Sequence, residues 1–541
     1  MITFDLNGAQ VQVPDESGSL LDALRDHLGV VSAKDGCAPQ GQCGCCTVWV
    51  DDEPRVSCVT PIKRVSGRSV TTLEGLGPAL PEWAAAFVAC GATQCGFCTP
   101  GIVMRLEALR RRGTLLDPDA ADRGLAAHLC RCTGWQTIGE AAACIATGTT
   151  PSLGDRDLNQ AAIRATIEGG VPQVVGEQVV AGFVGFADDQ VPDFGSSRST
   201  VSTLVAMLDA DGQWRTAPTV AETRVVIGAV QGRRTTVAVT PPLALPDGDW
   251  AVTLATSWVE PGYLEPDSST AQPSGPPSSP VNNGGAFGAK SNSPLPAAAA
   301  RLAAELSVPI RARWRREDVV RLGPKRPPMA IGLRADGTGV IRVVRTAGIA
   351  DILAASAPEL VIEEVEVPGP PTSVAIRAAG WAELAVVRAG LATTTTGSGN
   401  DSSTDPDSCV TVTDPCGGRA SARVDSSSGS PVIHVEVWAG QVLDHVVLRS
   451  YCIGAAHQAL GWVTSEGLCV DDDGTVLDLT IRSHGILKAS ETPGIVVEIH
   501  AEDGPSIRGS DAVFAAVAAA VWNHQGRPPS WPTGRSLGSP S

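Results

Sequence analysis

The sequence predicts an α+β protein built from several domains, and three observations lead to that fold class. The chain has 541 residues, enough for about three or four domains that each bury a core of their own. Apolar residues alternate at Ile2, Phe4 and Leu6, as in a half-buried strand, whereas residues 105–112 and 120–128 carry them at helical spacing. The 15 cysteines include two compact sets that lie among these strand and helix signals.

The first element is a predicted β-hairpin at the N-terminus. Val11 and Val13 repeat the alternation of residues 2–6, and Asn7-Gly8 stands between the two runs. Asn-Gly is favoured in two-residue hairpin turns because both turn positions need a positive φ. Paired strands are therefore expected to open the chain.

The first cysteine set follows this hairpin, in the segment GCAPQGQCGCCTVWV at residues 36–50. A plant-type [2Fe-2S] site takes three thiolates from one tight loop, usually spaced C-x4-C-x2-C, and a fourth from a later strand. Here the first gap is five residues, Cys45 is a spare thiol, and interleaved glycines let the loop wrap round a cluster. We therefore predict a [2Fe-2S] cluster whose ligands are Cys37, Cys43, Cys46 and Cys58.

The second set occupies the segments QCGFCTPG and HLCRCTGW, which flank the helical stretch. Its C-x2-C and C-x-C pairs are predicted to lie at the ends of packed helices. Four cysteines in such pairs also suit a structural zinc ion, which stays open as the alternative. A neighbouring electron-transfer cluster favours a second iron-sulfur centre, whose ligands would be Cys95, Cys98, Cys130 and Cys132.

Composition and charge argue against several classes of partner. The net charge of -17 disfavours nucleic acid, because binding a phosphate backbone depends on Lys and Arg. The sequence contains no run of 18 apolar residues, so no membrane span is predicted. The N-terminus lacks the basic and apolar regions of a signal peptide. The odd cysteine count then indicates a reducing compartment. We expect a cytoplasmic protein with no membrane or nucleic-acid partner.

The remaining segments are interpreted from composition. Hydrophobic residues make up 43% of the chain but aromatic residues only 4%, so the cores must rest on Ala, Val, Leu and Ile. Residues 265–283, rich in Pro and Ser, and residues 393–408, rich in Thr, Ser and Gly, cannot bury enough apolar surface to order themselves. Both stretches are expected to be surface loops or linkers.

Taken in order, GCAPQGQCGCCTV, TLEGL, QCGFCTPGIVM and CRCTGW resemble the two [2Fe-2S] domains of the xanthine dehydrogenase and aldehyde oxidase family, the molybdenum hydroxylases. The resemblance implies a β-grasp [2Fe-2S] ferredoxin domain at residues 1–78 and a four-helix [2Fe-2S] domain at residues 79–155. It further implies a shortened α+β molybdopterin-binding-like region, divided into residues 156–350 and 351–541. The implied cofactors are two [2Fe-2S] clusters and a molybdenum-molybdopterin.

A glycine turn, NNGGAFGAK at residues 282–290, resembles the family less closely. GGAFGAK is similar to the family's GGGFGGK turn, which implies that Gly285, Ala286, Phe287 and Gly288 approach the molybdenum ligands. The same segment nearly spells a nucleotide-binding P-loop, but an alanine replaces the glycine before the lysine and no buried strand is expected in front. A purely structural entry to an alanine-rich helix stays open as a third interpretation.

Two further segments resemble pterin-binding parts of the family. AIRAAGWAE, residues 375–383, partly matches an Arg-Gly-x-Gly-x-Pro-Glu loop and assigns Arg377 to the cofactor, although an ordinary amphipathic helix has the same composition. In SYCIGAAHQALGWVTSEGL, residues 450–468, the matching glutamine is Gln458, which would equally satisfy a helix terminus. The resemblance also assigns Gln94, in the second cysteine set, to the cofactor.

The catalytic glutamate of the family has no direct counterpart. In IRGSDAVF, residues 507–514, Ser510 takes the glutamate position and Asp511 follows it. A shorter carboxylate serves as a general base only where the loop shifts to bring it into reach, because such catalysis depends on geometry first and pKa second. Asp511 is the candidate catalytic residue, with an ordinary helix N-cap as its alternative.

These expectations combine into one predicted function and one alternative. The resemblance implies oxidation of an aldehyde or N-heterocycle at a molybdopterin centre, with electrons leaving through two [2Fe-2S] clusters. No flavin domain is recognised after the helical cluster domain, so we expect a separate FAD subunit or another electron acceptor. The alternative is a non-catalytic electron-transfer or cofactor-holding subunit that has lost its base. The sequence sets no oligomeric state and is compatible with a homodimer.

Overall fold

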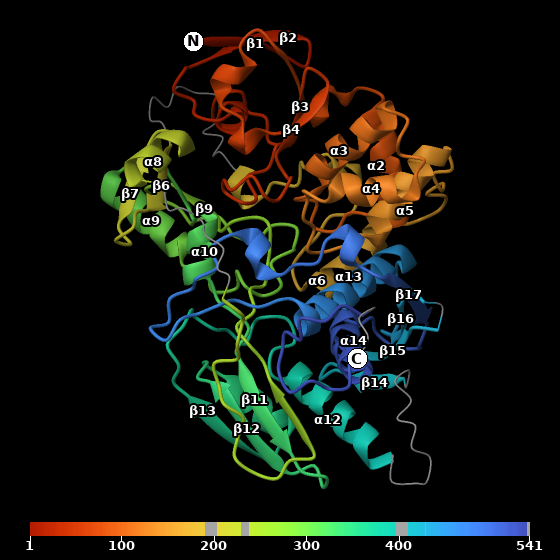
Figure 1. Cartoon of the computed structure of the whole chain (residues 1–541). Coiled ribbons are helices and arrows are strands. Elements are labelled where there is room, and N and C mark those ends of the chain that lie inside the picture. Colours follow the sequence, from red (N-terminus) through yellow and green to blue (C-terminus); the bar gives the residue numbers. More distant parts are fainter. Residues whose placement is uncertain (190–202, 229–236, 397–408, 428, 538–541) are drawn as a thin grey trace.

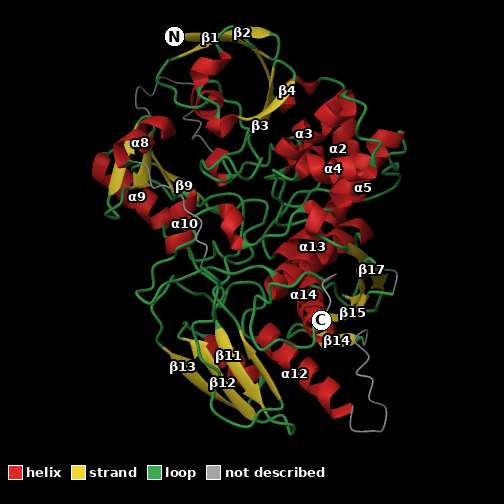
Figure 2. Ribbon diagram, in the orientation of Figure 1, coloured by secondary structure: helices red, strands yellow, loops and turns green. Residues whose placement is uncertain are grey.

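A computed structural model of the chain describes residues 1–189, 203–228, 237–396, 409–427 and 429–537. Within these residues it contains four β-sheets with helices packed on and between them (Figure 1, Figure 2). Mixed sheets and helices in several units confirm the α+β, multidomain class predicted from the sequence. None of the helices in the described part of the chain is long and apolar enough to cross a bilayer.

The first sheet holds the N-terminal hairpin. Its strands are β1 (Ile2–Leu6), β2 (Ala9–Val13), β3 (Thr47–Val50), β4 (Glu53–Val56) and β5 (Ser69–Thr71), in the order β2-β1-β5-β3-β4. β1 and β2 pair antiparallel with Leu6 opposite Ala9, which confirms the hairpin at Asn7-Gly8. A short helix, α1 (Leu20–Asp22), precedes the first cysteine loop, and this loop leads directly into β3.

A group of helices follows the first sheet. These helices are α2 (Ala79–Cys90), α3 (Thr99–Arg111), α4 (Pro118–Leu125) and α5 (Gln136–Thr147). The segments with helical spacing at residues 105–112 and 120–128 fall mainly in α3 and α4. Cys95 and Cys98 come just before α3, and Cys130 and Cys132 lie between α4 and α5. The second cysteine set therefore lies at helix ends, as predicted.

The second sheet has the order β7-β6-β10-β9 and carries helices at its side (Figure 1). Its elements are β6 (Leu204–Leu208), β7 (Trp214–Ala217), β9 (Ser268–Ala271), β10 (Ile310–Arg313), α8 (Val220–Ile227), α9 (Leu295–Leu306) and α10 (Arg316–Leu322). The surface-loop expectation for residues 265–283 is wrong at residues 265–271, which are buried and include β9. Hydrogen bonds rather than apolar area order this part: Ser269 donates to the carbonyl of Ser278 at 2.7 Å, and β9 pairs with β10. Residues 397–408 of the second stretch lie outside the described residues.

The third sheet has the order β13-β12-β11-β8. It consists of β8 (Val252–Ala255), β11 (Met329–Leu333), β12 (Gly339–Val344) and β13 (Leu360–Val365), with α11 (Ile349–Ser356) between the last two strands and α12 (Trp381–Thr396) beside them. β12 and β13 pair in parallel on either side of residue 350, where a domain boundary was placed. The four domain limits stay predictions.

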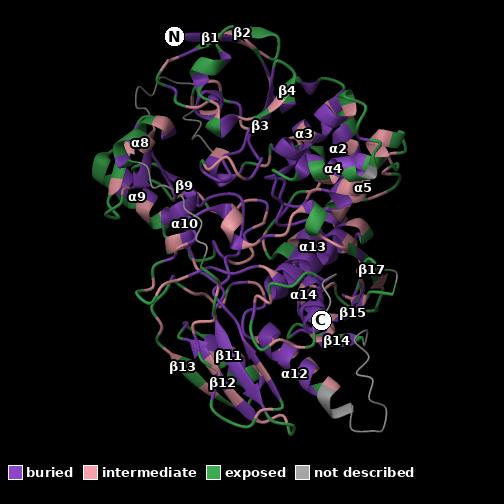
Figure 3. Ribbon diagram, viewed as in Figure 1, coloured by how far each residue is buried: buried purple, intermediate pink, exposed green. Residues whose placement is uncertain are grey.

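The fourth sheet, β14-β15-β16-β17, packs against the longest helices. Its elements are β14 (Val410–Thr413), β15 (Arg419–Asp425), β16 (Val432–Trp438), β17 (Gly494–His500), α13 (His445–Thr464) and α14 (Ser510–His524), with α6 (Leu158–Gly169) and α7 (Glu177–Val180) earlier in the chain. α13 and α14 pack side by side and are buried almost throughout (Figure 3). Six of the buried residues of α14 are alanines, at 512, 515, 516, 518, 519 and 520, so this core rests on small aliphatic side chains, as the composition predicted.

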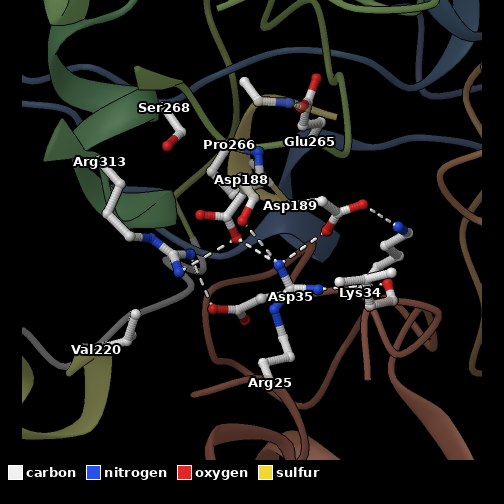
Figure 4. A network of polar contacts seen from close by, with 12 residues as sticks. Arg25, Lys34, Asp35, Asp188, Asp189, Val220, Glu265, Pro266, Ser268 and Arg313 are labelled. Atoms are coloured by element: carbon white, nitrogen blue, oxygen red, sulfur yellow. Dashed lines mark hydrogen bonds and ion pairs between the residues drawn. The ribbon is translucent and has the colours of Figure 1, made fainter. Parts of the chain in front are cut away.

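Charged side chains from distant segments meet in a buried ion network between the first and second sheets (Figure 4). Asp35 pairs with Arg224 at 2.6 Å and with Arg313 at 2.9 Å. Arg313 also pairs with Asp188 at 3.3 Å, Arg25 pairs with both Asp188 and Asp189, and Lys34 pairs with Asp189. Burial alone would raise the pKa of Asp35, but the two arginines beside it hold that pKa well below its ordinary value. The network fixes the segment before the first cysteine loop against the rest of the protein.

Candidate functional site

The first thiol set consists of Cys37, Cys43, Cys46 and Cys58, all of which are buried in one place. The Sγ atom of Cys37 accepts the main-chain N–H of Gln40 at 3.2 Å, and Sγ of Cys46 accepts that of Cys58 at 3.5 Å. Hydrogen bonds from the thiols of Cys43 and Cys58 hold the pKa of Cys37 well below its ordinary value. The loop thus gathers four sulfur atoms and directs amide donors at them, which is the environment of an iron-sulfur cluster.

The second thiol set, formed by Cys95, Cys98, Cys130 and Cys132, is arranged as two pairs. The Sγ atoms of Cys95 and Cys132 are 3.6 Å apart, and Cys98 and Cys130 are hydrogen-bonded to each other. Among the described residues, no three His, Cys, Asp or Glu side chains are arranged round a single metal position. Two pairs of thiols match a [2Fe-2S] cluster, which takes two ligands on each iron, better than the tetrahedral zinc alternative.

The two thiol sets are in direct contact through main chain and glycine. The main-chain N–H of Leu129 donates to the carbonyl of Cys43 at 3.0 Å, which ties the second set to the first loop. A Cβ atom at Gly36 would lie 3.0 Å from Sγ of Cys43 and 3.2 Å from the ring of Phe97. A side chain at this position would therefore crowd the thiols and the ring. The spare thiol, Cys45, is also buried here, 3.2 Å from the same Cβ position.

A central cavity of about 230 Å³ separates the second thiol set from the C-terminal part of the chain. Cys95, Cys132 and Gln94 form one wall. Opposite lie Gly284–Gly288, which we call the glycine loop, and several polar side chains, including Glu168, Arg377, Tyr451, Arg508 and Asp511. Two smaller hollows, of about 10 and 30 Å³, share lining residues with the cavity. The cavity alone is smaller than the roughly 300 to 1,000 Å³ of ordinary small-molecule sites.

The glycine loop approaches its neighbours so closely that two of its residues can only be glycine. A Cβ atom at Gly288 would lie 1.6 Å from the carbonyl oxygen of Ala375, and one at Gly285 would lie 2.9 Å from Sγ of Cys95. The main-chain N–H of Arg377 donates to the carbonyl of Phe287 at 3.1 Å. The glycine loop is thereby joined both to the second thiol set and to the segment at residues 375–383 that was predicted to bind the pterin.

Lys290 excludes the P-loop interpretation of this segment. Its ammonium group is buried and pairs with the carboxylate of Glu265 at 2.8 Å. It also donates to the carbonyl of Pro280 at 3.0 Å. A P-loop lysine must instead reach the phosphates of a nucleotide. Likewise residues 375–380 form turns rather than an amphipathic helix, and α12 begins only at Trp381.

Arg377 connects the candidate residues of the C-terminal part into an arginine-aspartate cluster, which we define as Arg377, Arg508, Ser510 and Asp511. The guanidinium of Arg377 donates to Oδ1 of Asp511 at 2.8 Å, to Oγ of Ser510 at 2.5 Å and to Oε1 of Gln458 at 3.2 Å. Its charge also lies 5.9 Å from the ring centre of Phe287. The structure therefore brings together residues from four segments that the sequence nominated separately.

Asp511 is held between two cations. Arg508 donates to its second oxygen, Oδ2, at 3.0 Å, while Arg377 binds the first. Burial would raise the pKa of Asp511, but the charges of both arginines outweigh it and lower the pKa below the ordinary value. Asp511 is not a helix N-cap, since Gly509 holds that position and makes no side-chain cap. Both carboxylate oxygens are engaged, which leaves this side chain a fixed anion and a poor proton acceptor.

The two glutamines assigned to a cofactor are used by the protein itself in different ways. The side-chain amide of Gln94 donates to the carbonyl of Cys132 at 3.0 Å and to that of Ser450 at 3.1 Å. Gln94 also lines the central cavity. The amide of Gln458 donates to the carbonyl of Arg131 at 3.0 Å and lines the smaller hollow. Gln458 therefore satisfies no helix terminus, and Gln94 is the better placed of the two towards the central cavity.

Sequence reasoning missed Glu168, which organises the start of α14. Its buried carboxylate accepts the main-chain N–H groups of Gly509 and Ser510 at 3.0 Å each, and it pairs with Arg164 one turn earlier in α6. A carboxylate at a helix N-terminus satisfies free amides and is favoured by the helix dipole. The only sequence signal was an Arg-Glu pair four residues apart, which is common on solvent-exposed helices.

Comparison with known proteins identifies the family. Residues 72–143 match the family of the [2Fe-2S] binding domain. The chain is 40% identical over 137 residues to the xanthine dehydrogenase iron-sulfur-binding subunit of Escherichia coli O157:H7, a match that covers 25% of this chain and 86% of that subunit. The chain belongs to the molybdenum hydroxylase family of xanthine dehydrogenases and aldehyde oxidases. The resemblance stated from the cysteine motifs is thereby confirmed.

In sequence, the match to these members of the molybdenum hydroxylase family covers about a quarter of this chain. The xanthine dehydrogenase of Blastobotrys adeninivorans is 38% identical over 156 residues, which span 26% of this chain and only 11% of that enzyme. The fold is shared much further. An aldehyde oxidoreductase from Desulfovibrio gigas aligns over 97% of both chains with a TM-score of 0.68, at 14% sequence identity.

Proposed function

We propose that this protein is an iron-sulfur oxidoreductase that passes electrons between a molybdopterin group in the central cavity and an outside acceptor, through two [2Fe-2S] clusters. One observation carries the proposal: Cys95 and Cys132 line the same cavity as the glycine loop and Arg377. A redox group bound there would lie against two ligands of the second cluster. The contact between the two thiol sets, from Leu129 to Cys43, would then continue the path.

The side chains round the central cavity fit a polar, anionic cofactor. Arg377, Arg508 and Lys290 bring three positive charges to the lining against the two carboxylates of Asp511 and Glu168, and Gln94 adds a carboxamide. A molybdopterin is a phosphorylated heterocycle, so guanidinium and amide groups of this kind would hold it. When bound, the molybdenum group would supply two-electron oxidation chemistry. Because the cavity is small, Phe287 and Arg377, which separate it from the neighbouring hollow, would need to turn aside.

The substrate we propose is a small aldehyde or N-heterocycle, in keeping with the aldehyde oxidoreductases that share the fold. The acceptor we propose is a separate FAD subunit or another redox protein. The relative from Escherichia coli is by name one subunit of a larger enzyme, which supports an acceptor on another chain. We also retain the cytoplasm as the proposed location.

A second candidate function is a non-catalytic electron-transfer or cofactor-holding subunit. The two ion pairs of Asp511, at 2.8 and 3.0 Å, favour it, since they oppose the general-base role proposed for this residue. For Asp511 to act as base, the pair with Arg377 would first have to break and the carboxylate would have to turn towards the substrate. In the second candidate function no such movement is needed.

Metal analysis of the purified protein separates these proposals. The enzyme proposal expects about four irons, the content of two [2Fe-2S] clusters, together with molybdenum and reduction of a dye by aldehydes. Full iron without molybdenum, in protein from a host supplied with molybdate, would leave only the electron-transfer subunit. Anaerobically prepared protein without iron would contradict both candidate functions.

A further inference from the structure

A pair of cysteines outside both thiol sets lies between two helices of the second domain. Cys90 is the last residue of α2 and Cys144 lies in α5, and their Sγ atoms are 3.9 Å apart. Both are half-buried, whereas the cysteines of the two thiol sets are buried. The pair is thus close enough for its thiols to touch and open enough for a small reagent to reach them.

We propose that Cys90 and Cys144 form a reversible disulfide by exchange with a low-molecular-weight disulfide such as oxidised glutathione. One thiolate attacks the reagent, forms a mixed disulfide and releases the first glutathione thiol. The second thiolate then attacks the protein sulfur of this mixed disulfide and releases the second. Two protein thiols are oxidised to one disulfide, the reagent is reduced to two thiols, and the two protons pass to the released glutathiones.

The geometry of the helices suits this bond. A disulfide joins sulfur atoms at about 2.05 Å, so the two sulfurs of Cys90 and Cys144, at 3.9 Å, must approach by about 2 Å. α2 and α5 already pack against each other along their length. Cys90 is the last residue of its helix, and Gly91 after it has a left-handed conformation that ends the helix. Rotation of the two side chains and a small shift of one helix end close the gap.

The charged neighbours set the speed of the exchange. Burial, the nearby Cys144 and the carboxylate of Glu140 raise the pKa of Cys90 to about 12. The guanidinium of Arg449, which pairs with Glu140 at 2.6 Å, acts in the opposite direction. Because the thiolate is the attacking species, exchange is slow at neutral pH and accelerates as the pH rises. Slow exchange distinguishes this pair from a catalytic dithiol.

The bond would act on the turn that leads to the second thiol set. The hydroxyl of Ser450 donates to the carbonyl of Gly91 at 2.7 Å, and the carbonyl of Ser450 accepts the amide of Gln94. A disulfide at residue 90 therefore fixes the start of a turn that carries Gln94 and Cys95 to the central cavity. Oxidation of the pair would limit movement at the cavity wall beside the second cluster.

The test treats the intact, cluster-containing protein with oxidised glutathione at pH 8.5, blocks the remaining thiols with an alkylating reagent, and maps peptides without reduction. The expected result is a peptide that joins residues 90 and 144 and that disappears on reduction. In Cys90→Ser and Cys144→Ser the remaining thiol should instead carry glutathione. Cys409→Ser, which removes an exposed cysteine outside the pair, should leave the cross-link unchanged.

Two results would overturn the proposal. One is the absence of the 90–144 peptide when the clusters are intact and the exposed cysteines react. The other is wild-type protein that accumulates glutathione on Cys90 or Cys144 without cross-linking, which would show that the helices hold the sulfurs apart. Iron content measured before and after oxidation confirms that the cluster ligands took no part.

Discussion

The second thiol set and the arginine-aspartate cluster face each other across the central cavity, and they match known sequences to very different degrees. Residues 72–143, which hold the second thiol set, match the [2Fe-2S] binding domain, and a quarter of the chain is 40% identical to a bacterial iron-sulfur subunit. Over 97% of the chain as a whole, the fold is shared with an aldehyde oxidoreductase at only 14% identity. Iron ligation tolerates few residue types, whereas packed helices and sheets accept many sequences. The difference indicates that cluster-binding loops restrict the sequence more than the packed helices and sheets around them do.

The largest expected effect tests the thiol side of this comparison. Cys98→Ser removes one ligand of the proposed second cluster, and we expect the iron content to fall from about four to about two per chain, with loss of one of two spectroscopic signals at low temperature. Cys45→Ser is the matched control, because Cys45 is buried beside the first set but is not a proposed ligand. Equal iron loss in both variants would contradict the ligand assignment.

The buried ion network should dominate stability. Asp35→Asn leaves Arg224 and Arg313 facing a neutral amide in a buried site, and breaking such a pair costs about 3 to 5 kcal/mol. Denaturant unfolding of the variant and the wild type should show this loss of free energy of unfolding. The control variant Asp473→Asn, at an exposed turn, should unfold at the same denaturant midpoint as the wild type. If Asp35→Asn also unfolded at the wild-type midpoint, the network would not contribute to stability.

The stability of the protein should depend on pH through three buried histidines. Burial lowers the pKa of His128 to about 3 and those of His457 and His484 to about 4. Between pH 6.5 and about 4 the unfolded chain binds protons on these imidazoles and the folded chain does not. The free energy of unfolding should therefore fall as the pH drops, by up to about 1.4 kcal/mol per unit for each histidine.

The slope of unfolding free energy against pH checks this expectation. His457→Gln should reduce this slope by the contribution of one buried histidine. The control variant His445→Gln, at an exposed position, should leave the slope unchanged. If both variants retain the slope of the wild type, His457 is charged in the folded protein.

The smallest expected effect concerns Asp511. Since both its oxygens are bound by arginines, Asp511→Asn should lower the rate of dye reduction, with an aldehyde as the electron donor, by less than about tenfold. Removal of a general base typically costs about 10² to 10⁴. A loss in that range, together with a shifted pH profile, would assign Asp511 to the chemistry and make the cavity an active hydroxylase site. Arg508→Lys, which keeps one charge beside Asp511, is the matched control.

Local patterns in the sequence anticipated much of the fold. The hairpin at Asn7-Gly8, the helices α3 and α4 and the aliphatic core of α14 all follow from spacing or composition over a few residues. The expectation failed at residues 265–271, where hydrogen bonds from serine and threonine order a buried strand that composition assigned to the surface. Composition measures apolar area and does not register such bonds.

By itself, the sequence determined the two sets of cysteines and the family, because ligand spacing and helix periodicity are short-range properties. Only the tertiary structure decided the state of Asp511. Its partner Arg377 is 134 residues away in the chain, and Gln458 is 81 residues from the same arginine. No local pattern predicts which charges will meet over such separations. Whether a carboxylate is a free base or a fixed anion depends on the charges that folding brings within hydrogen-bonding distance.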